Sequence, residues 1–245
     1  MELQRLLSLT RKAVDEYHQI QDDDRIAVGI SGGKDSLTLL YALANLRRFY
    51  PHKFQLEAIT VDLGLPGFDT EGISKLCKEL SVPYTVVKTD IYDIVFNNRQ
   101  ETNPCSLCSK MRKGALNEAI IKLGCNKVAY GHHKDDVVET LMMSLIYEGR
   151  LHTFCPVTYL DRTKLYVIRP LLYIDESDII GFRNKMDLPV AGKLCPADGD
   201  TKREYVKQML QKLNAENPGV KDRIFTAIQR SGLKGWNINE EHELS

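Results

Sequence analysis

The sequence predicts an α/β fold with a doubly wound, mostly parallel sheet and a helical C-terminal extension. Two observations support this fold class. Short β-branched runs alternate with helical patterns through the first 150 residues, and polar stretches that contain glycine directly follow three of these runs. Such alternation is typical of βαβ units, whose parallel strands lie between helices on both faces of the sheet. Ligands of these sheets bind beyond the carboxyl ends of the strands, so the three polar stretches are expected to share one edge.

Each element is placed by its residue pattern. The β-branched runs predict strands over 25–30, 55–61, 84–88 and 127–130, and the patterns between them predict helices over 36–48, 70–80, 106–123 and 137–147. Beyond residue 150 we expect a hairpin or short strands within 153–169, a helix near 176–184, and amphipathic helices over 202–213 and 219–230. The expected division is an N-terminal helix within 1–24, a main domain over 25–190 and a helical extension over 191–245.

The composition indicates an ordinary globular protein. A chain of 245 residues, 43% hydrophobic and 27% charged, is long enough for one large α/β domain and is too apolar for disorder. Charges interrupt the apolar residues of the first twenty positions, and no apolar run approaches membrane length. We therefore expect a cytoplasmic protein that does not associate with membranes.

The formal net charge of zero argues against a uniformly basic surface, but one segment is strongly basic. Residues 202–234 hold eight basic residues against three acidic ones. In the helix over 202–213 the expected buried stripe leaves Arg203 and Lys207 on the opposite side. That stripe consists of Tyr205, Val206, Met209, Leu210 and Leu213. The basic side is either a surface for nucleic-acid phosphates or a solvated helix face.

The most informative segment is RIAVGISGGKDS at 25–36. Gly32 and Gly33 carry no Cβ, so the backbone can turn tightly and direct N–H groups at an anion in front of the following helix. Lys34 adds a mobile positive charge, and Asp35 suggests a magnesium ion beside bound phosphates. The segment is not a Walker A loop, which requires Ser or Thr directly after the lysine. The alternative is an ordinary glycine-rich turn from strand to helix.

A second segment, GHHKDDVVET at 131–140, opens a predicted helix. Asp136 and Glu139 fit the spacing of a capping box, which would account for Asp136 structurally. Capping does not account for His132, His133 and Asp135, which crowd beside it at the expected ligand edge. A functional role for this cluster is therefore favoured.

The six cysteines are expected to be reduced, because disulfide frameworks are rare in cytosolic proteins. Cys105 and Cys108 form a C-x-x-C at the start of a predicted helix, where the helix N-terminus favours thiolates. Cys195 lies in a loop rich in Pro and Gly and is the favoured third site cysteine. This set could hold a metal, act as a redox dithiol, or form a zinc site with a histidine. Packing is expected for the others, Cys77, Cys125 and Cys155.

Together these motifs resemble the tRNA 2-thiocytidine synthetase family of PP-loop ATP pyrophosphatases. The resemblance rests on SGGKDS, VDLGLPGF, PCSLCSKMRKGAL, GHHKDDVVET, VIRPLLYIDESDI, the Cys195 loop and PGVKDRIFTAIQR, and it extends from about residue 25 to about residue 232. It implies the adenine nucleotide alpha hydrolase-like fold and a homodimer. One departure is that the family's distal loop is usually C-x-x-C-G, whereas Pro-Ala-Asp follows Cys195 here.

The resemblance also implies site residues. ATP and magnesium would lie against Gly29, Ile30, Ser31, Gly32, Gly33, Lys34, Asp35, Ser36, Asp62, Gly131 and Asp136, with Lys34, Asp35, Asp136 and His132 catalytic. A [4Fe-4S] cluster would be held by Cys105, Cys108 and Cys195, which leaves one iron open for a hydrosulfide. The phosphates of tRNA would meet Lys202, Arg203, Lys207, Arg223 and Arg230.

The predicted reaction is ATP-dependent tRNA thiolation. The C2 carbonyl of a pyrimidine, with cytidine favoured over uridine, is a poor electrophile, so its oxygen is first adenylated and then replaced by sulfur from sulfide or a donor such as a cysteine desulfurase. Three alternatives remain open from the sequence. They are a persulfide carried by Cys105 or Cys108, an adenylating enzyme for a small molecule, and an ATP- and metal-binding regulatory module without turnover.

Overall fold

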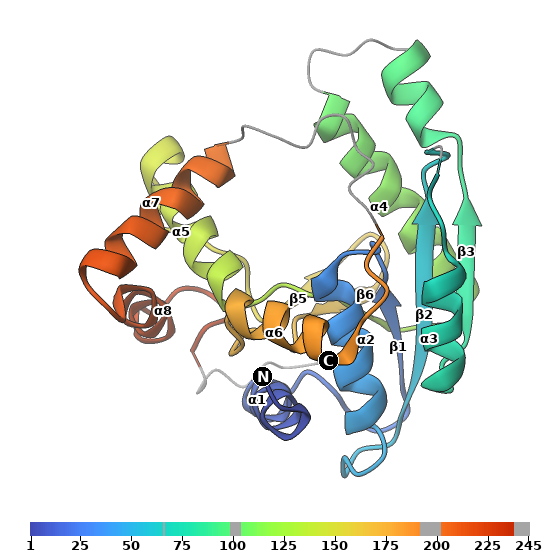
Figure 1. Ribbon diagram of the computed structural model, residues 1–245, viewed down its shortest axis with the longest axis horizontal. Coiled ribbons are helices and arrows are strands. Elements are labelled where there is room, and N and C mark those ends of the chain that lie inside the picture. Colours follow the sequence, from blue (N-terminus) through green and yellow to red (C-terminus); the bar gives the residue numbers. More distant parts are fainter. Residues whose placement is uncertain (66, 99–103, 192–201, 238–245) are drawn as a thin grey trace.

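A computed structural model describes residues 1–65, 67–98, 104–191 and 202–237. Its sheet has six strands in the order β3-β2-β1-β4-β6-β5 (Figure 1). The strands are β1 (Asp24–Gly29), β2 (Phe54–Asp62), β3 (Tyr84–Lys88), β4 (Lys127–Ala129), β5 (Val157–Leu160) and β6 (Leu165–Ile168). Only β5 is antiparallel to its neighbour, because the tight turn at 161–164 joins it to β6. The predicted α/β class with a mostly parallel sheet is confirmed.

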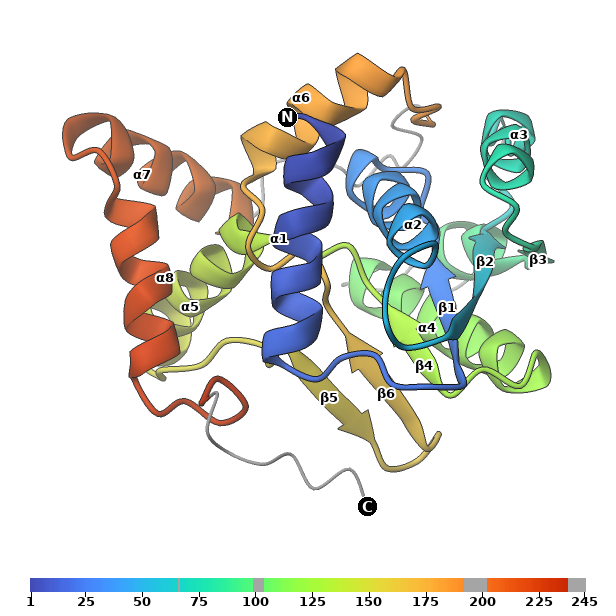
Figure 2. The same cartoon turned by 90° about the horizontal axis from the view of Figure 1, so that it is seen from below.

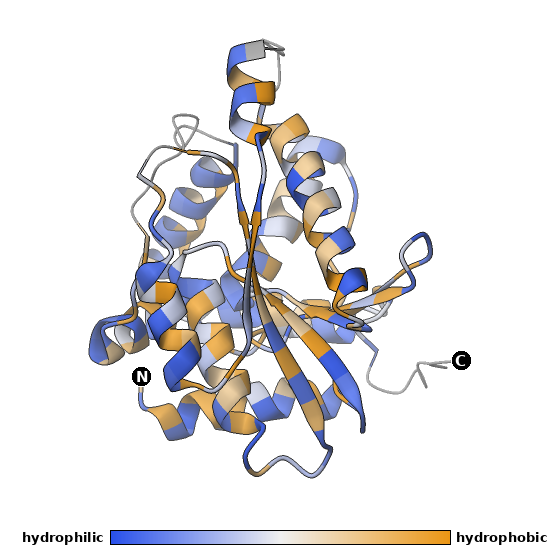
Figure 3. Ribbon diagram, turned by 90° about the vertical axis from the view of Figure 1, so that its right-hand side faces the viewer, coloured by the Kyte–Doolittle hydropathy of each residue, from blue (hydrophilic) through white to orange (hydrophobic). Residues whose placement is uncertain are grey.

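The helices cover both faces of the sheet (Figure 2). They are α1 (Leu3–Glu16), α2 (Lys34–Leu46), α3 (Glu71–Glu79), α4 (Pro104–Lys122), α5 (Lys134–Glu148), α6 (Glu176–Met186), α7 (Lys202–Glu216) and α8 (Val220–Arg230), with a short π-helix at Asp93–Asn98. One apolar cluster joins α1, α2, α3 and α6 to the sheet, and a second joins α4 to the opposite face. The strands are mostly apolar, whereas the covering helices mix apolar and polar residues (Figure 3).

A third apolar cluster joins α5, α7 and α8 beside the sheet. The side chain of Trp236 is fully buried in it, together with Val206 and Leu210 of α7. The stripe predicted for α7 is therefore too wide, since Tyr205 is 60% exposed and Leu213 is 39% exposed. The physical reason is that α7 buries only the narrow side that meets α5 and α8, which leaves its flanks in solvent.

Two predicted boundaries differ from the structure in ways that affect the site. α2 begins at Lys34 rather than at 36, and α5 begins at Lys134 rather than at 137. Both helices therefore start directly at the carboxyl edge of the sheet. No helix in the described ranges is long and apolar enough to cross a membrane.

Candidate functional site

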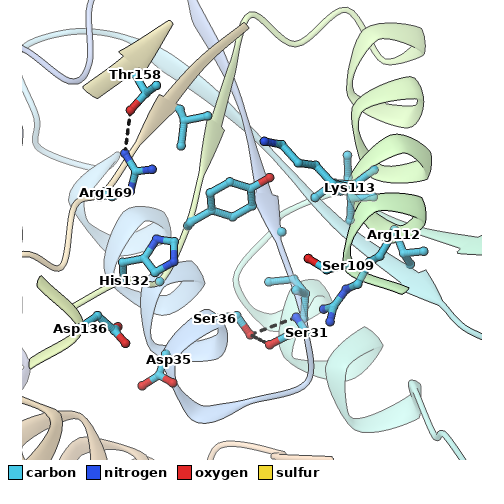
Figure 4. A pocket seen from close by; sticks show the side chains of 18 of the residues that line it. Ser31, Asp35, Ser36, Ser109, Arg112, Lys113, His132, Asp136, Thr158 and Arg169 are labelled. Carbon is cyan, nitrogen blue, oxygen red and sulfur yellow. Dashed lines mark hydrogen bonds between the residues drawn. The ribbon is translucent and has the colours of Figure 1, made fainter. Parts of the chain in front are cut away.

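A cavity of about 620 Å³ lies between α4 and the carboxyl edge of the sheet (Figure 4). Eight of the predicted site residues line it, and they come from β1, the start of α2 and the segment between β4 and α5. They are Gly29, Ile30, Ser31, Asp35, Ser36, Gly131, His132 and Asp136. The fold thus brings together two motifs that are about a hundred residues apart in the chain.

The loop between β1 and α2 is held in shape by its own serines. Ser36 Oγ accepts the N–H of Ser31 at 3.2 Å and donates to the carbonyl of Gly33 at 3.0 Å. Gly32 has φ +80°, and a Cβ there would lie 2.9 Å from Cβ of Ala191, so the turn requires glycine. The first N–H groups of α2 have no intrahelical acceptor, which makes this turn suitable for an anion.

A close approach of two chain segments places the acidic groups together. A Cβ on Gly131 would lie 2.8 Å from the carbonyl carbon of Asp35, so only glycine lets the end of β4 pack against the start of α2. As a result Asp35 and Asp136 both reach the cavity. Asp35 Oδ1 is buried and has no hydrogen-bond partner in the described part of the chain, although Lys34 Nζ lies 3.1 Å and His133 Nε2 lies 3.7 Å from it.

Lys34 lies on the other side of the loop. With Gly32 and Gly33 it lines a second hollow of about 400 Å³, next to the end of α6. Its Nζ is 3.1 Å from Asp35 Oδ1 and 3.1 Å from Glu176 Oε1. Burial works to lower the pKa of Lys34, but these two carboxylates outweigh burial and raise it. Lys34 is therefore charged and already paired.

Asp62 lines neither hollow. Its Oδ1 accepts the N–H of Gly64 at 2.9 Å and so closes the turn after β2. A contact between Asp62 and adenosine stays a prediction.

The capping role expected for Asp136 differs from the one observed. Because α5 begins three residues earlier, His133 is its N-cap and Asp136 lies in its first turn, where Oδ2 accepts the N–H of His133 at 3.0 Å. Glu139 therefore does not form the capping box with Asp136 that the sequence predicts. It pairs with Arg203 at 3.1 Å, and burial raises its pKa above the ordinary value.

Asp135 connects the site to the C-terminal helices. It is buried, its Oδ2 accepts the N–H of Glu176 at 2.7 Å, and Lys221 of α8 forms an ion pair with it. Burial works to raise the pKa of Asp135, but the bonds from Lys221 and Glu176 outweigh burial and lower it. The carboxylate is therefore ionised and structural in this arrangement.

His132 projects into the cavity, where its ring stacks on Phe154 with centroids 4.8 Å apart. Burial, helped by the charge of Arg169, lowers the pKa of His132 to about 4. The imidazole is therefore neutral at pH 7.

The sequence did not reveal several groups that line the cavity. Arg112 and Lys113 extend from α4, and Arg169 follows β6 directly. Two signals in the sequence could have indicated site residues. Arg112 lies one helical turn beyond Cys108 on α4, and Arg169 stands at the carboxyl edge of a strand. None of the three cations pairs with a carboxylate among the residues that the structure describes. They give the cavity an electropositive side.

The two C-x-x-C thiols lie in the first two turns of α4, and Ser109, which directly follows Cys108, lines the cavity. Cys105 is exposed and Cys108 is partly buried. Cys195 lies outside the described residues, and no three metal-binding side chains gather within them. Cys77 and Cys125 are packed as predicted, and burial raises the pKa of each to about 11. Cys155 is only partly buried and donates to the carbonyl of Lys234 at 3.1 Å.

The predicted basic face of α7 and α8 is partly turned inward. Arg203 pairs with Glu139, and Lys207 Nζ lies 2.7 Å from Glu176 Oε2. The alternative of a freely solvated helix face therefore does not hold for these two side chains, since they hold α7 against the site, and a contact of either with tRNA stays a prediction. Lys202 lies 4.8 Å from the centroid of the Tyr147 ring.

Two cations of α8, Arg223 and Arg230, face outward, unlike Lys221. Arg223 Nη2 donates to Asn217 at 2.8 Å in the turn before α8, and Arg230 is exposed at the end of that helix. Neither side chain contacts the cavity residues named above.

Comparisons with known proteins agree with this geometry. Residues 5–213 match the family model described as a PP-loop domain. The chain is 41% identical over 220 residues to a tRNA-cytidine(32) 2-sulfurtransferase of Geobacter sulfurreducens, covering 89% of this chain and 86% of that protein. It is 38% identical over 243 residues to the enzyme of the same name from Citrifermentans bemidjiense, covering 98% and 92%.

A solved structure is also similar. The U34-tRNA thiolase NcsA from Methanococcus maripaludis, determined with its [4Fe-4S] cluster, superimposes with a TM-score of 0.72 at 27% identity. The match covers 91% of this chain and 77% of the thiolase.

Proposed function

Since the chain belongs to the PP-loop family and, within it, to the tRNA-cytidine 2-sulfurtransferases, we propose that it replaces the C2 oxygen of a tRNA cytidine with sulfur at the expense of ATP. The observation that carries the proposal is the shared cavity. A glycine turn suited to an anion borders this cavity at the carboxyl edge of the sheet, and two carboxylates and three cations without carboxylate partners among the described residues line it. The position in tRNA would be 32, as in the names of the relatives.

The reaction requires two displacements. In the first, the C2 oxygen of cytidine attacks the α-phosphorus of ATP, and pyrophosphate leaves. In the second, a sulfur nucleophile adds at C2, and AMP leaves with the original oxygen. Adenylation thus converts a poor leaving group into a good one.

The loop residues would serve the first displacement. The N–H groups at the start of α2 and the ammonium of Lys34 would hold the phosphates and stabilise the charge that moves onto pyrophosphate. For this role Lys34 exchanges its contact with Glu176 for a phosphate oxygen. Asp35 and Asp136 would hold magnesium, and Asp35 Oδ1, which has only the ammonium of Lys34 and the ring of His133 near it among the described residues, is a suitable oxygen ligand.

The cysteines would serve the second displacement. Cys105 and Cys108 lie on one side of α4 in its first two turns, which fits two thiolate ligands of a cluster, and Cys195 would be the third. A [4Fe-4S] cluster bound there would supply an open iron that presents sulfide. The neutral imidazole of His132 is available for hydrogen bonding beside the reacting groups.

The test is nucleoside mass spectrometry on bulk tRNA after anaerobic incubation with reconstituted protein, Mg-ATP and sulfide. We expect 2-thiocytidine from the wild-type protein and none from Cys105→Ala. The matched control is Cys77→Ala, which removes a buried thiol of α3 and should keep both product and iron. Thiolation by Cys105→Ala with unchanged yield would refute the cluster assignment, and thiolation by iron-free protein would favour a persulfide.

A further inference from the structure

One wall of the cavity contains an arginine that has no counter-ion among the described residues. Arg169 is only 8% exposed and lines the cavity (Figure 4). Its Nη1 donates to the carbonyl of Cys155, and also to Thr158 Oγ1, which lies 3.1 Å away. Its Nε is buried and has no hydrogen-bond partner in the part of the chain that the structure describes. A buried charged donor without an acceptor is costly, so the arrangement indicates a ligand that supplies acceptors.

The rest of the residue is firmly held. Gln19 accepts the backbone N–H of Arg169 at 3.1 Å and donates to its carbonyl at 3.3 Å. The guanidinium carbon lies 4.9 Å from the centroid of the Phe154 ring, on which His132 also stacks. The backbone, the ring contact and Nη1 are therefore fixed, whereas Nε and Nη2 have no hydrogen-bond partner among the described residues.

We propose that this Nε–Nη2 edge binds N3 and O2 of the target cytosine and makes the enzyme accept cytidine rather than uridine. The inference rests on the proposed function. Two parallel N–H donors of a guanidinium fit two adjacent acceptors, which cytosine presents at N3 and O2. Uracil carries a hydrogen at N3, so one donor would face another donor. O2 keeps a second lone pair for the attack on ATP.

The surroundings of Arg169 suit a base better than a phosphate. Phe154, Tyr130 and Leu160 provide aromatic and apolar surface near this wall, which is typical of sites for planar rings. The turn suited to an anion lies between β1 and α2 and contributes Ser31 and Ser36 to the same cavity, whereas Arg169 follows β6. Arg169 is thus assigned as a specificity-determining residue and not as a phosphate ligand.

The experiment compares two tRNA transcripts that differ only in cytidine or uridine at the target position. Thiolation rates and KM for ATP are measured for wild type, Arg169→Met and the matched control Arg162→Met, which removes an exposed charge from the turn between β5 and β6. Arg169→Met should thiolate the cytidine transcript at least tenfold more slowly and lower the cytidine-to-uridine ratio at least tenfold, because it loses a bidentate contact. The KM for ATP should stay unchanged in both variants, and Arg162→Met should keep the wild-type cytidine-to-uridine ratio.

A ratio within threefold of the wild type in Arg169→Met would overturn the proposal, as would a raised KM for ATP with an unchanged ratio. If Arg169→Met does not fold, Arg169→Lys decides, because it keeps the charge but lacks the planar edge and should also lose the ratio. Failure of the proposed function is a separate result, namely no thiolated nucleoside from wild type on either transcript.

Discussion

The cations on the two sides of the site differ in their partners. On the side of α6, α7 and α8, Lys34, Lys207 and Lys221 each pair with a carboxylate of α2, α5 or α6. In the cavity under α4, Arg112, Lys113 and Arg169 have no carboxylate partner among the described residues. Paired charges hold the C-terminal helices against the loop between β1 and α2, whereas the others are available to a ligand. The proposed function requires Lys34 to leave Glu176 and join the second group.

The largest effect is expected for Lys34→Ala. If Lys34 moves to the phosphates, its removal should slow AMP formation at least a hundredfold, since it removes a charge from the transition state. Formation of AMP from labelled ATP in the presence of tRNA measures this. Lys75→Ala, at an exposed position of α3, should behave like the wild type. Normal AMP formation by Lys34→Ala would mean that Lys34 has only a structural role.

The paired side is tested through stability. Glu176 accepts from both Lys34 and Lys207, so Glu176→Gln leaves two ammonium groups close together without their shared carboxylate. We expect a loss of about 1–3 kcal/mol in the free energy of unfolding, measured by urea titration. The control is Glu118→Gln, which breaks a solvent-exposed pair with Lys122 and should leave the free energy of unfolding nearly unchanged. Equal losses of stability in Glu176→Gln and Glu118→Gln would contradict a stabilising role of the contacts that Glu176 makes with Lys34 and Lys207.

The cavity side is tested through pH. Burial lowers the pKa of His132 to about 4, below its unfolded value of about 6.5. Between these values the unfolded state binds more protons than the native state, so stability should rise with pH over this window. Urea midpoints at pH 4.5 and 7 should differ less in His132→Gln than in wild type. His52→Gln, at a surface pair with Asp22, should keep the wild-type difference, and an unchanged difference in His132→Gln would show that this histidine titrates normally.

The smallest effect concerns tRNA binding. Arg230 is exposed on α8, so Arg230→Ala should reduce the slope of log K against log salt by about one. Lys207→Ala should change stability more than the slope, because its charge is already paired. Filter binding over a range of salt concentrations measures both. A smaller slope in Lys207→Ala than in Arg230→Ala would mean that Lys207, and not Arg230, contacts the tRNA phosphates.

The sequence predicted the strands, the helices and the eight cavity residues named above, because strand edges and glycine turns are set by local chemistry. The β1 loop and the segment from Gly131 to Asp136 were both located at the correct edge. The sequence could not show which cations are paired, since the partners of Arg203 and Lys207 lie far away in the chain. Arg169 was missed for the same reason, because its lack of a partner is visible only after folding.

The most direct test of the account follows the C2 oxygen itself. A transcript with ¹⁸O at C2 of the target cytidine is thiolated with Mg-ATP, and the AMP released is analysed by mass spectrometry. Adenylation of that oxygen predicts that AMP carries the label in proportion to the 2-thiocytidine formed. Thiolated tRNA together with unlabelled AMP would contradict activation of C2 through its oxygen.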